Sequence, residues 1–397
     1  MTDTTPTTPT LAEKFVALRD AIDARLVERS KETLTAVTAV ISGTHHFQLG
    51  PPGTAKSLSV RTLVDHVDFG DDAATYFEVL MTKFSTPEEV FGPVSVKGLE
   101  QDVYRRQTDG YLPTSKFAFV DEIFKANSSV LNSLLWIMNE RKFRNDGEIK
   151  DVPLVSLFCA SNELPQGEEL EALYDRIHFR HLVRPIQEQG NFIQMLKGQM
   201  AGAPTKILTI EEVLQARTDA MAVDLPEDVL EAVNSLRNNL RKEGIEPTDR
   251  RFAECLKIIK ATAWLAGRPQ ADIDDMRLLR HVLWTTQDEM STVERLVLEL
   301  ANPLDKEAMD LLEQVEKLAT ELDEVIRDAD NKQVRNKKGI ELHGKLERAK
   351  NELDALNKRV DKTGRRSEIV TQLEQRLLGV TRTLLKEIFR IESQPET

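Results

Sequence analysis

GPPGTAKS, residues 50–57, nearly repeats the pattern G-x-x-x-x-G-K-[ST] of a phosphate-binding loop. HHFQL precedes it and KSLSVRTLVDHV follows from its last two residues, so the order is strand, glycine turn and helix. In such a loop, backbone N–H groups and the positive end of the helix face phosphate oxygens. Ala55 replaces the second glycine of the pattern. We expect a working loop, because alanine is tolerated there if φ is negative at the entry to the helix.

The loop residues predicted to bind a nucleotide are Gly50, Pro51, Pro52, Gly53, Thr54, Ala55, Lys56, Ser57 and Leu58. Gly50 and Gly53 serve the strained part of the turn. Lys56 would reach the β and γ phosphates, and Ser57 would bind Mg²⁺ through its hydroxyl.

Four further apolar runs alternate with helical patterns up to about residue 195. They are TYFEVLM (75–81), FAFV (117–120), VSLFCA (155–160) and HLV (181–183). Buried runs separated by helices indicate a parallel sheet covered on both faces, so the predicted class is α/β.

Polar residues follow these runs. Asp121 can bind Mg²⁺ through water and Glu122 can polarise a lytic water, since carboxylates beside a fully apolar run are costly unless they work. Asn162 can position the attacking water, or it caps a turn. Arg176 and Arg180 flank the last strand; either is a surface ion-pair residue or an arginine finger given to a neighbouring subunit, which requires an oligomer.

The composition changes three times along the chain. Residues 1–10 form a Thr/Pro tail that we expect to be disordered, 11–195 the α/β domain, and 205–300 a small helical domain. From 304 to 397, heptads of Leu, Val and Ile predict a three-helix arm with antiparallel helices. Such heptads usually bury a seam, which favours a scaffold or docking role for the arm.

Charge and cysteine content exclude several classes. A net charge of -13 argues against a surface that coats nucleic acid, although a small basic pore remains compatible with it. Cys159 and Cys255 have no ligand-like spacing and are expected to be reduced thiols. No secretory signal and no run of 18 apolar residues is present, so we expect a cytoplasmic protein without membrane insertion.

Taken together, these motifs resemble the AAA+ ATPases, and specifically the MoxR family. The resemblance covers about residues 10–300. The regulatory ATPase variant A branch is similar in detail and also has alanine before the loop lysine. The segments that carry the resemblance are GPPGTAKS, LMTKFSTPEEVFGPVS, GYLP, FVDEIFKANSSVLNSLLWIMNERKFRN, ASNELP and LYDR.

The resemblance implies a role for each matched position. Lys56 and Ser57 match Walker A, Asp121 and Glu122 match Walker B, and Asn162 matches sensor 1. Arg176 matches the arginine finger, and Arg180 is a weaker candidate for that role. Arg250 matches sensor 2, although Arg251 lies beside it. The adenine pocket is expected near Leu26 and Val27. The implied cofactors are ATP and Mg²⁺.

The implied function is an ATP-hydrolysing ring motor, with six subunits expected, that remodels or activates a protein partner in a chaperone-like way. A partner with a von Willebrand factor A domain is expected. Two insertions, 94–113 with β-type alternation and 142–153 with turn residues Asp146 and Gly147, would face the pore and the partner. The branch's β-rich insertion in the arm is missing here.

Two alternatives stay open. A motor acting on nucleic acid would use the basic clusters KQVRNKK (332–338) and GRRS (364–367), which in an acidic chain are more often solvated turns. A non-catalytic scaffold would bind nucleotide only to order the ring, and the heptad arm would then do the work.

Overall fold

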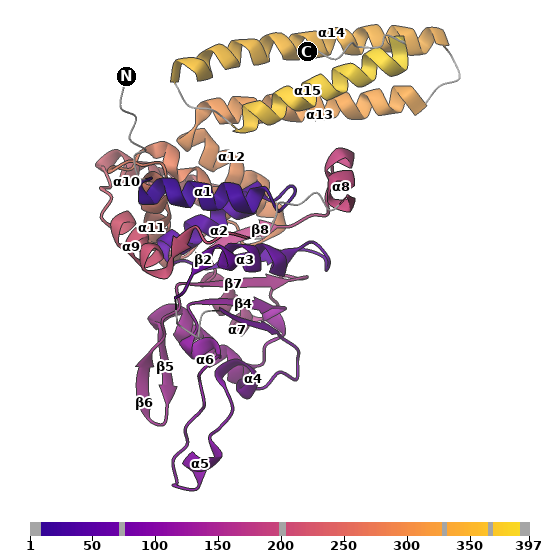
Figure 1. The fold of residues 1–397 in the computed structure, drawn as a ribbon. Coiled ribbons are helices and arrows are strands. Elements are labelled where there is room, and N and C mark those ends of the chain that lie inside the picture. Colours follow the sequence, from indigo (N-terminus) through magenta and orange to yellow (C-terminus); the bar gives the residue numbers. More distant parts are fainter. Residues whose placement is uncertain (1–8, 71–75, 198–203, 328–331, 364–367, 390–397) are drawn as a thin grey trace, which may run out of the picture. The chain divides into compact units, whose positions relative to one another are not determined.

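The computed structural model in Figure 1 divides into two compact units between Glu294 and Arg295. The described residues are 9–70, 76–197, 204–327, 332–363 and 368–389. Residues 1–8 of the predicted tail therefore lie outside the described residues. Thr10 caps the first helix by accepting a hydrogen bond from the Glu13 N–H.

A five-stranded parallel sheet forms the centre of the first unit and confirms the predicted α/β class. In spatial order its strands are β3 (Tyr76–Leu80), β4 (Phe117–Asp121), β7 (Ser156–Ser161), β1 (His46–Leu49) and β8 (Phe179–Leu182). β8 begins two residues before the predicted run HLV, because Phe179 and Arg180 also pair with β1. The carboxyl ends of β4, β7 and β1 are neighbours, which places Asp121, Asn162 and the glycine loop at one edge.

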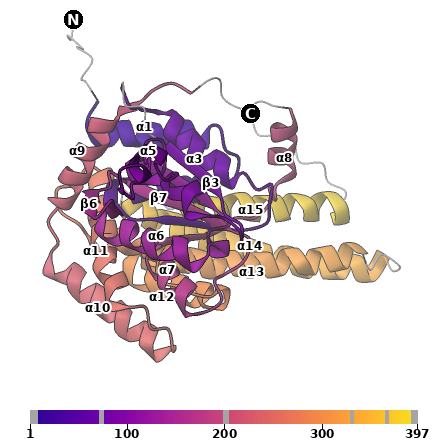
Figure 2. The same ribbon diagram turned by 90° about the horizontal axis from the view of Figure 1, so that it is seen from below.

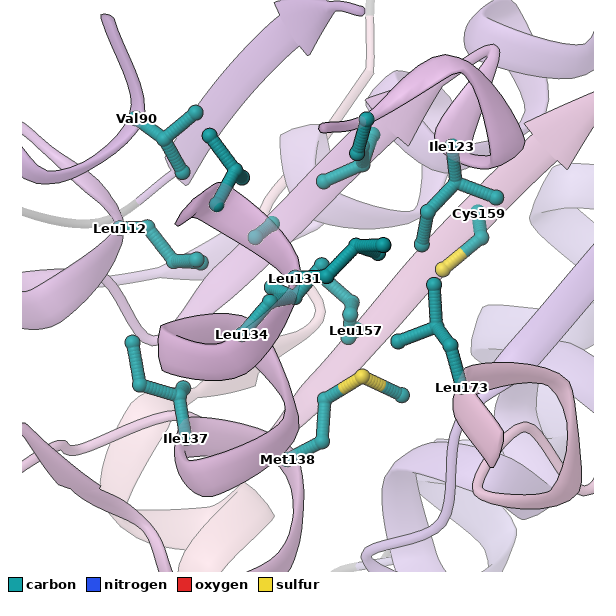
Figure 3. Packing of buried hydrophobic residues seen from close by; sticks show 14 of the residues in the cluster. Val90, Leu112, Ile123, Leu131, Leu134, Ile137, Met138, Leu157, Cys159 and Leu173 are labelled. Atoms are coloured by element: carbon teal, nitrogen blue, oxygen red, sulfur yellow. The ribbon is translucent and has the colours of Figure 1, made fainter. Parts of the chain in front are cut away.

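Helices cover both faces of this sheet. The helices concerned are α1 (Leu11–Asp23), α2 (Ser30–Ser42), α3 (Lys56–Asp65), α6 (Ser128–Glu140) and α7 (Glu168–Asp175). Figure 3 shows one core, in which Leu131, Leu134, Ile137 and Met138 of α6 pack with Leu157 and Cys159 of β7.

The second core lies on the opposite face, against α1, α2 and α3. Side chains of a strand alternate between faces, and in β4 Ala118 and Val120 join the first core while Phe117 and Phe119 join the second. All four are buried, which explains the continuous apolar run FAFV.

The two insertions have different structures. Residues 142–153 form the predicted hairpin, β5 (Lys142–Asn145) and β6 (Glu148–Asp151), whose turn has φ 56° at Asp146 and 73° at Gly147. The β-type expectation for 94–113 is wrong. After α4 (Pro87–Phe91), Ser95 caps a short helix, α5 (Val96–Leu99), by accepting from the Gly98 N–H, and only Val94 and Arg106 form an isolated bridge.

Helices dominate the rest of the first unit. They are α8 (Gln189–Leu196), α9 (Ile210–Met221), α10 (Glu227–Lys242), α11 (Asp249–Leu265), the 3₁₀ helix η3 (Ile273–His281) and α12 (Met290–Ala301), which crosses the division between the units. Two short strands, β2 (Val67–Asp68) and β9 (Leu208–Thr209), pair in parallel. Short 3₁₀ turns complete the unit at Leu112–Thr114, Ile123–Lys125 and Gln287–Glu289. Figure 2 shows α9, α10 and α11 grouped together.

The second unit is the predicted three-helix arm. It consists of α13 (Pro303–Arg327), α14 (Lys332–Thr363), α15 (Glu368–Leu384) and a π turn (Leu385–Phe389). The heptad residues form its core, and Arg359 pairs with Glu307 from α14 to α13. Of the two basic clusters, GRRS lies outside the described residues, as do the first three side chains of KQVRNKK. Within the described part of the chain, no helix is long and apolar enough to cross a membrane.

Candidate functional site

The glycine loop joins β1 to α3, and its last residue is strained. Ala55 has φ 64° and ψ 26°, in the left-handed region, directly before the helix begins at Lys56. The expected negative φ is therefore wrong, because the chain needs a left-handed residue to turn from the loop into α3. This conformation costs an L-residue about 1–2 kcal/mol, so the missing glycine leaves strain in the loop.

Gly50 and Gly53, the two remaining glycines of the loop, are required for different reasons. A Cβ on Gly50 would lie 2.3 Å from the Val183 carbonyl oxygen, so no side chain fits between the loop and the end of β8. Gly53 has open space around it but a φ of 79°. Both observations fit the predicted need for glycine in the tight part of the turn.

The Lys56 ammonium lies inside the loop. Its Nζ donates to the carbonyl oxygens of Gly50 (2.7 Å) and Pro51 (3.0 Å) and to Asn162 Oδ1 (3.4 Å). Burial lowers the pKa of Lys56, and Asp121 and Glu122 oppose that shift. The loop lysine and both strand-end carboxylates therefore share one electrostatic environment.

Glu122 is held at the centre of this arrangement. It has a left-handed φ of 51°, and its Oε1 accepts a hydrogen bond from the Asn162 amide. Its Oε2 pairs with Lys125 Nζ at 3.2 Å. Strained backbone at a buried, charged residue is common at functional sites. Asn162 thus links the lysine of the loop to the glutamate of β4.

Ser57 and Asp121 have the donor chemistry for Mg²⁺. Asp121 Oδ1 accepts from the Glu122 N–H at 3.0 Å, and Asp121 forms no ion pair with any residue that the structure describes. Ser57 makes no side-chain hydrogen bond within the same described ranges. A hydroxyl and a carboxylate left available at the glycine loop and at the end of β4 fit a cation that keeps most of its waters.

An apolar pocket of about 350 Å³ adjoins the loop. Its lining includes Leu26 and Val27, as predicted for the adenine pocket, with Gly53, Phe192 and Met195. Apolar walls and a volume of this order are common to small-molecule pockets in general, and an adenine site here stays a prediction.

The wall formed by α8 is fixed by one carboxylate. Glu28 accepts hydrogen bonds from the N–H groups of Gln187 (2.8 Å) and Glu188 (2.9 Å), just before α8 begins. Phe192 and Met195 are remote in sequence from the loop, and no local pattern marks them.

Arg180, the weaker candidate for the arginine finger, and Arg251, the weaker candidate for sensor 2, are both buried. Arg180 is 0% exposed and donates to the carbonyl oxygens of Tyr174 (2.6 Å) and Ile177 (3.2 Å). It therefore cannot extend to a neighbouring subunit. Arg251 is 2% exposed, donates to the Val282 carbonyl oxygen and pairs with Asp175 at 3.3 Å.

Arg176 and Arg250 lie together at a second cavity, of about 220 Å³. Burial, and then the nearby Arg250, lower the pKa of Arg176. Among the described residues, none of the glycine loop lines this cavity. The two predicted arginines are thus brought to each other and not to the loop of their own chain.

The comparisons with known proteins agree with this geometry. A family model described as the MoxR domain in the MoxR-vWA-beta-propeller ternary systems matches residues 13–222. An AAA lid domain model matches residues 228–297. The chain belongs to the MoxR family of AAA+ ATPases. Its placement in the regulatory ATPase variant A branch stays a prediction.

Relatives of this MoxR chain include two uncharacterized proteins of Methanocaldococcus jannaschii, each 38% identical. The matches cover 79% and 83% of this chain and 81% and 87% of theirs. The crystal structure of a "putative ATPase" from Cytophaga hutchinsonii has a TM-score of 0.59 at 17% identity and covers 74% of this chain and 95% of its own. At that identity the likeness concerns the fold alone.

Proposed function

We propose that this MoxR protein hydrolyses ATP in a ring, at sites shared by two copies of the chain. The observation that carries the proposal is the division of the predicted residues. Lys56, Asn162 and Glu122 are linked at the loop, whereas Arg176 lines a separate cavity. A triphosphate at the loop would therefore lack its arginine unless a second copy supplied one. Six copies are the family expectation.

Each residue at the loop would bind a different part of the nucleotide or its metal ion. The loop N–H groups and Lys56 would bind the phosphates, and Lys56 would exchange the carbonyls of Gly50 and Pro51 for phosphate oxygens. Ser57 and Asp121 would hold Mg²⁺, which would supply positive charge against the phosphates. The Leu26–Val27 pocket would receive the adenine ring.

Glu122 would act as the base that orients and deprotonates water. Its Oε1 accepts a hydrogen bond from Asn162, whereas its Oε2 pairs with Lys125 but accepts no hydrogen bond from any described residue. The contact with Asn162 would have to open before Oε1 could act on water. A γ phosphate that draws Lys56 and Asn162 toward itself would release Oε1, which couples nucleotide binding to activation of the base.

ATP hydrolysis would drive the remodelling of a protein partner, and a protein with a von Willebrand factor A domain is the expected class. The matching family model is described by ternary systems that contain such a domain. Exposed apolar side chains on the insertion and beside it offer contacts for a protein: Phe84 is 89% exposed, Val96 69% and Tyr104 58%.

The test is ATP turnover measured against protein concentration. Activity per chain should rise as copies assemble, and Glu122→Gln should bind ATP while losing about 100-fold or more of kcat. Mixing Lys56→Ala chains with Arg176→Ala chains, each inactive alone, should restore turnover at the interfaces where an intact loop meets an intact arginine. A turnover independent of concentration, with no restoration on mixing, would refute the shared site.

A further inference from the structure

The cavity that holds Arg176 and Arg250 is more basic than an arginine finger requires. α6, α9 and α11 each contribute cationic side chains to its lining. Arg141 comes from the end of α6, Arg217 from α9 and Lys257 from α11, so five cationic side chains line about 220 Å³ in a chain whose net charge is -13.

Two of these guanidinium groups converge on one glycine. Arg141 Nη2 donates to the Gly43 carbonyl oxygen at 3.0 Å, and a Cβ built on Gly43 would lie 2.4 Å from Arg217 Nη2. Burial, and then Arg217, lower the pKa of Arg141 to about 10, and burial lowers the pKa of Arg217. Arg217 therefore disfavours the charged form of Arg141.

Protein carboxylates do not balance this charge. Glu254 is the one carboxylate in the lining among the described residues, and it already pairs with Lys257 at 2.7 Å. Arg217 and Arg250 form no hydrogen bond or ion pair with any other residue that the structure describes. Cations held close together and partly buried need an anion to balance them.

A buried histidine at the same cavity supplies a second, independent observation. His178 is 7% exposed and lines the cavity, yet neither of its ring nitrogens has a hydrogen-bond partner within the described ranges. Arg176 Nε is likewise buried without a partner there. Unsatisfied buried donors are rare in folded proteins and point to a missing acceptor.

We propose that this cavity binds a phosphate group and that Arg217 is one of the residues that hold it. Arg217, Arg250 and Arg176 offer N–H donors in the planar geometry that suits phosphate oxygens. The phosphate is either a free inorganic anion or the end of a nucleotide bound by a second copy of this chain; the second source rests on the proposed function.

The first experiment tests a free anion. Chains carrying Lys56→Ala, which weakens the loop, are titrated with inorganic pyrophosphate by calorimetry at low ionic strength. Arg217→Gln should weaken binding about tenfold or more, as loss of a charge-assisted hydrogen bond does. Arg217→Lys should retain part of the affinity. Arg241→Gln, which removes the same charge from an exposed position on α10, should leave binding unchanged.

The second experiment tests a nucleotide on a neighbour. In the mixture of Lys56→Ala and Arg176→Ala chains, the Lys56→Ala chain supplies the cavity. Adding Arg217→Gln to that chain should lower the restored turnover about tenfold, and adding Arg241→Gln should not. Thermal melting of each variant checks that Arg217→Gln remains folded.

The outcomes separate the two claims. Dependence on Arg217 in the titration assigns a free anion, and dependence only in the mixture assigns the neighbour's nucleotide. If neither measurement depends on Arg217, the proposal is overturned. If the mixture shows no turnover even with Arg217 intact, the shared-site function fails, while the pyrophosphate titration still decides whether the cavity binds phosphate.

Discussion

Mild acid should unfold the first unit, because five of its histidines resist protonation in the folded state. They are His45, His46, His178, His181 and His281. Burial lowers the pKa of each below its ordinary value, that of His46 to about 3. The folded state therefore keeps them neutral at a pH where the unfolded chain, with histidine pKa near 6.5, takes up protons. Stability is complete above about pH 6.5 and falls as the pH drops below it.

The magnitude follows from proton linkage. Between pH 7 and pH 5.5, an unfolded histidine gains about 1.3 kcal/mol from protonation that a neutral buried one does not, so five cost the folded state about 6 kcal/mol. That is comparable with the whole free energy of unfolding of a typical domain, about 5–15 kcal/mol. The neighbouring Arg141 and Arg251 act in the same direction.

Urea unfolding followed by tryptophan fluorescence measures this directly. Trp136, Trp264 and Trp284, the three tryptophans of the chain, all precede the division at residue 294, so the signal reports the first unit. The urea midpoint should fall steeply from pH 7 to pH 5.5. His46→Gln should remove about a fifth of that slope, and His343→Gln, in the arm, none of it. A midpoint that does not change over this range would refute the reasoning.

Two further pairs of substitutions test the loop and the arginines. Ala55→Gly should relieve the left-handed strain and raise the free energy of unfolding by about 1 kcal/mol, whereas Ala24→Gly, at a φ of -64°, should lower it by about 0.5–1 kcal/mol; urea unfolding compares them. Arg180→Gln should destabilise the unit by about 3 kcal/mol, because carbonyl groups buried around it lose their donor, and Arg176→Gln should instead abolish turnover with little change in the melting temperature.

The strands and the edge where the site forms could be predicted because their signals are local. A buried parallel strand must be apolar on both faces, so FAFV followed by Asp121 and Glu122 marks both the strand and its carboxyl end. The hairpin at 142–153 was equally predictable, since Asp146 and Gly147 accept a positive φ. The roles assigned to the individual site residues stay predictions.

The rest depends on contacts that are remote in sequence. Arg180 is typical of a surface residue when seen in the sequence, but three distant or neighbouring carbonyls surround its guanidinium in the fold. Phe192 lines the apolar pocket from α8, whose start is held by the distant Glu28. Insertion 94–113 alternates like a strand, yet it has no partner strand, and the cap at Ser95 favours a helix instead.

Strand β8 is short, and a residue that bears on the candidate site lies beyond each of its ends. It begins three residues after Arg176, and Val183, just beyond it, donates to the Leu49 carbonyl oxygen and presses its own carbonyl against Gly50. Inserting or deleting one residue between them would turn every side chain of the strand to the opposite face and move Arg176 out of register with the loop. The length of β8 thus sets the distance between Arg176 and the loop. We therefore expect this segment to tolerate substitutions far better than insertions or deletions.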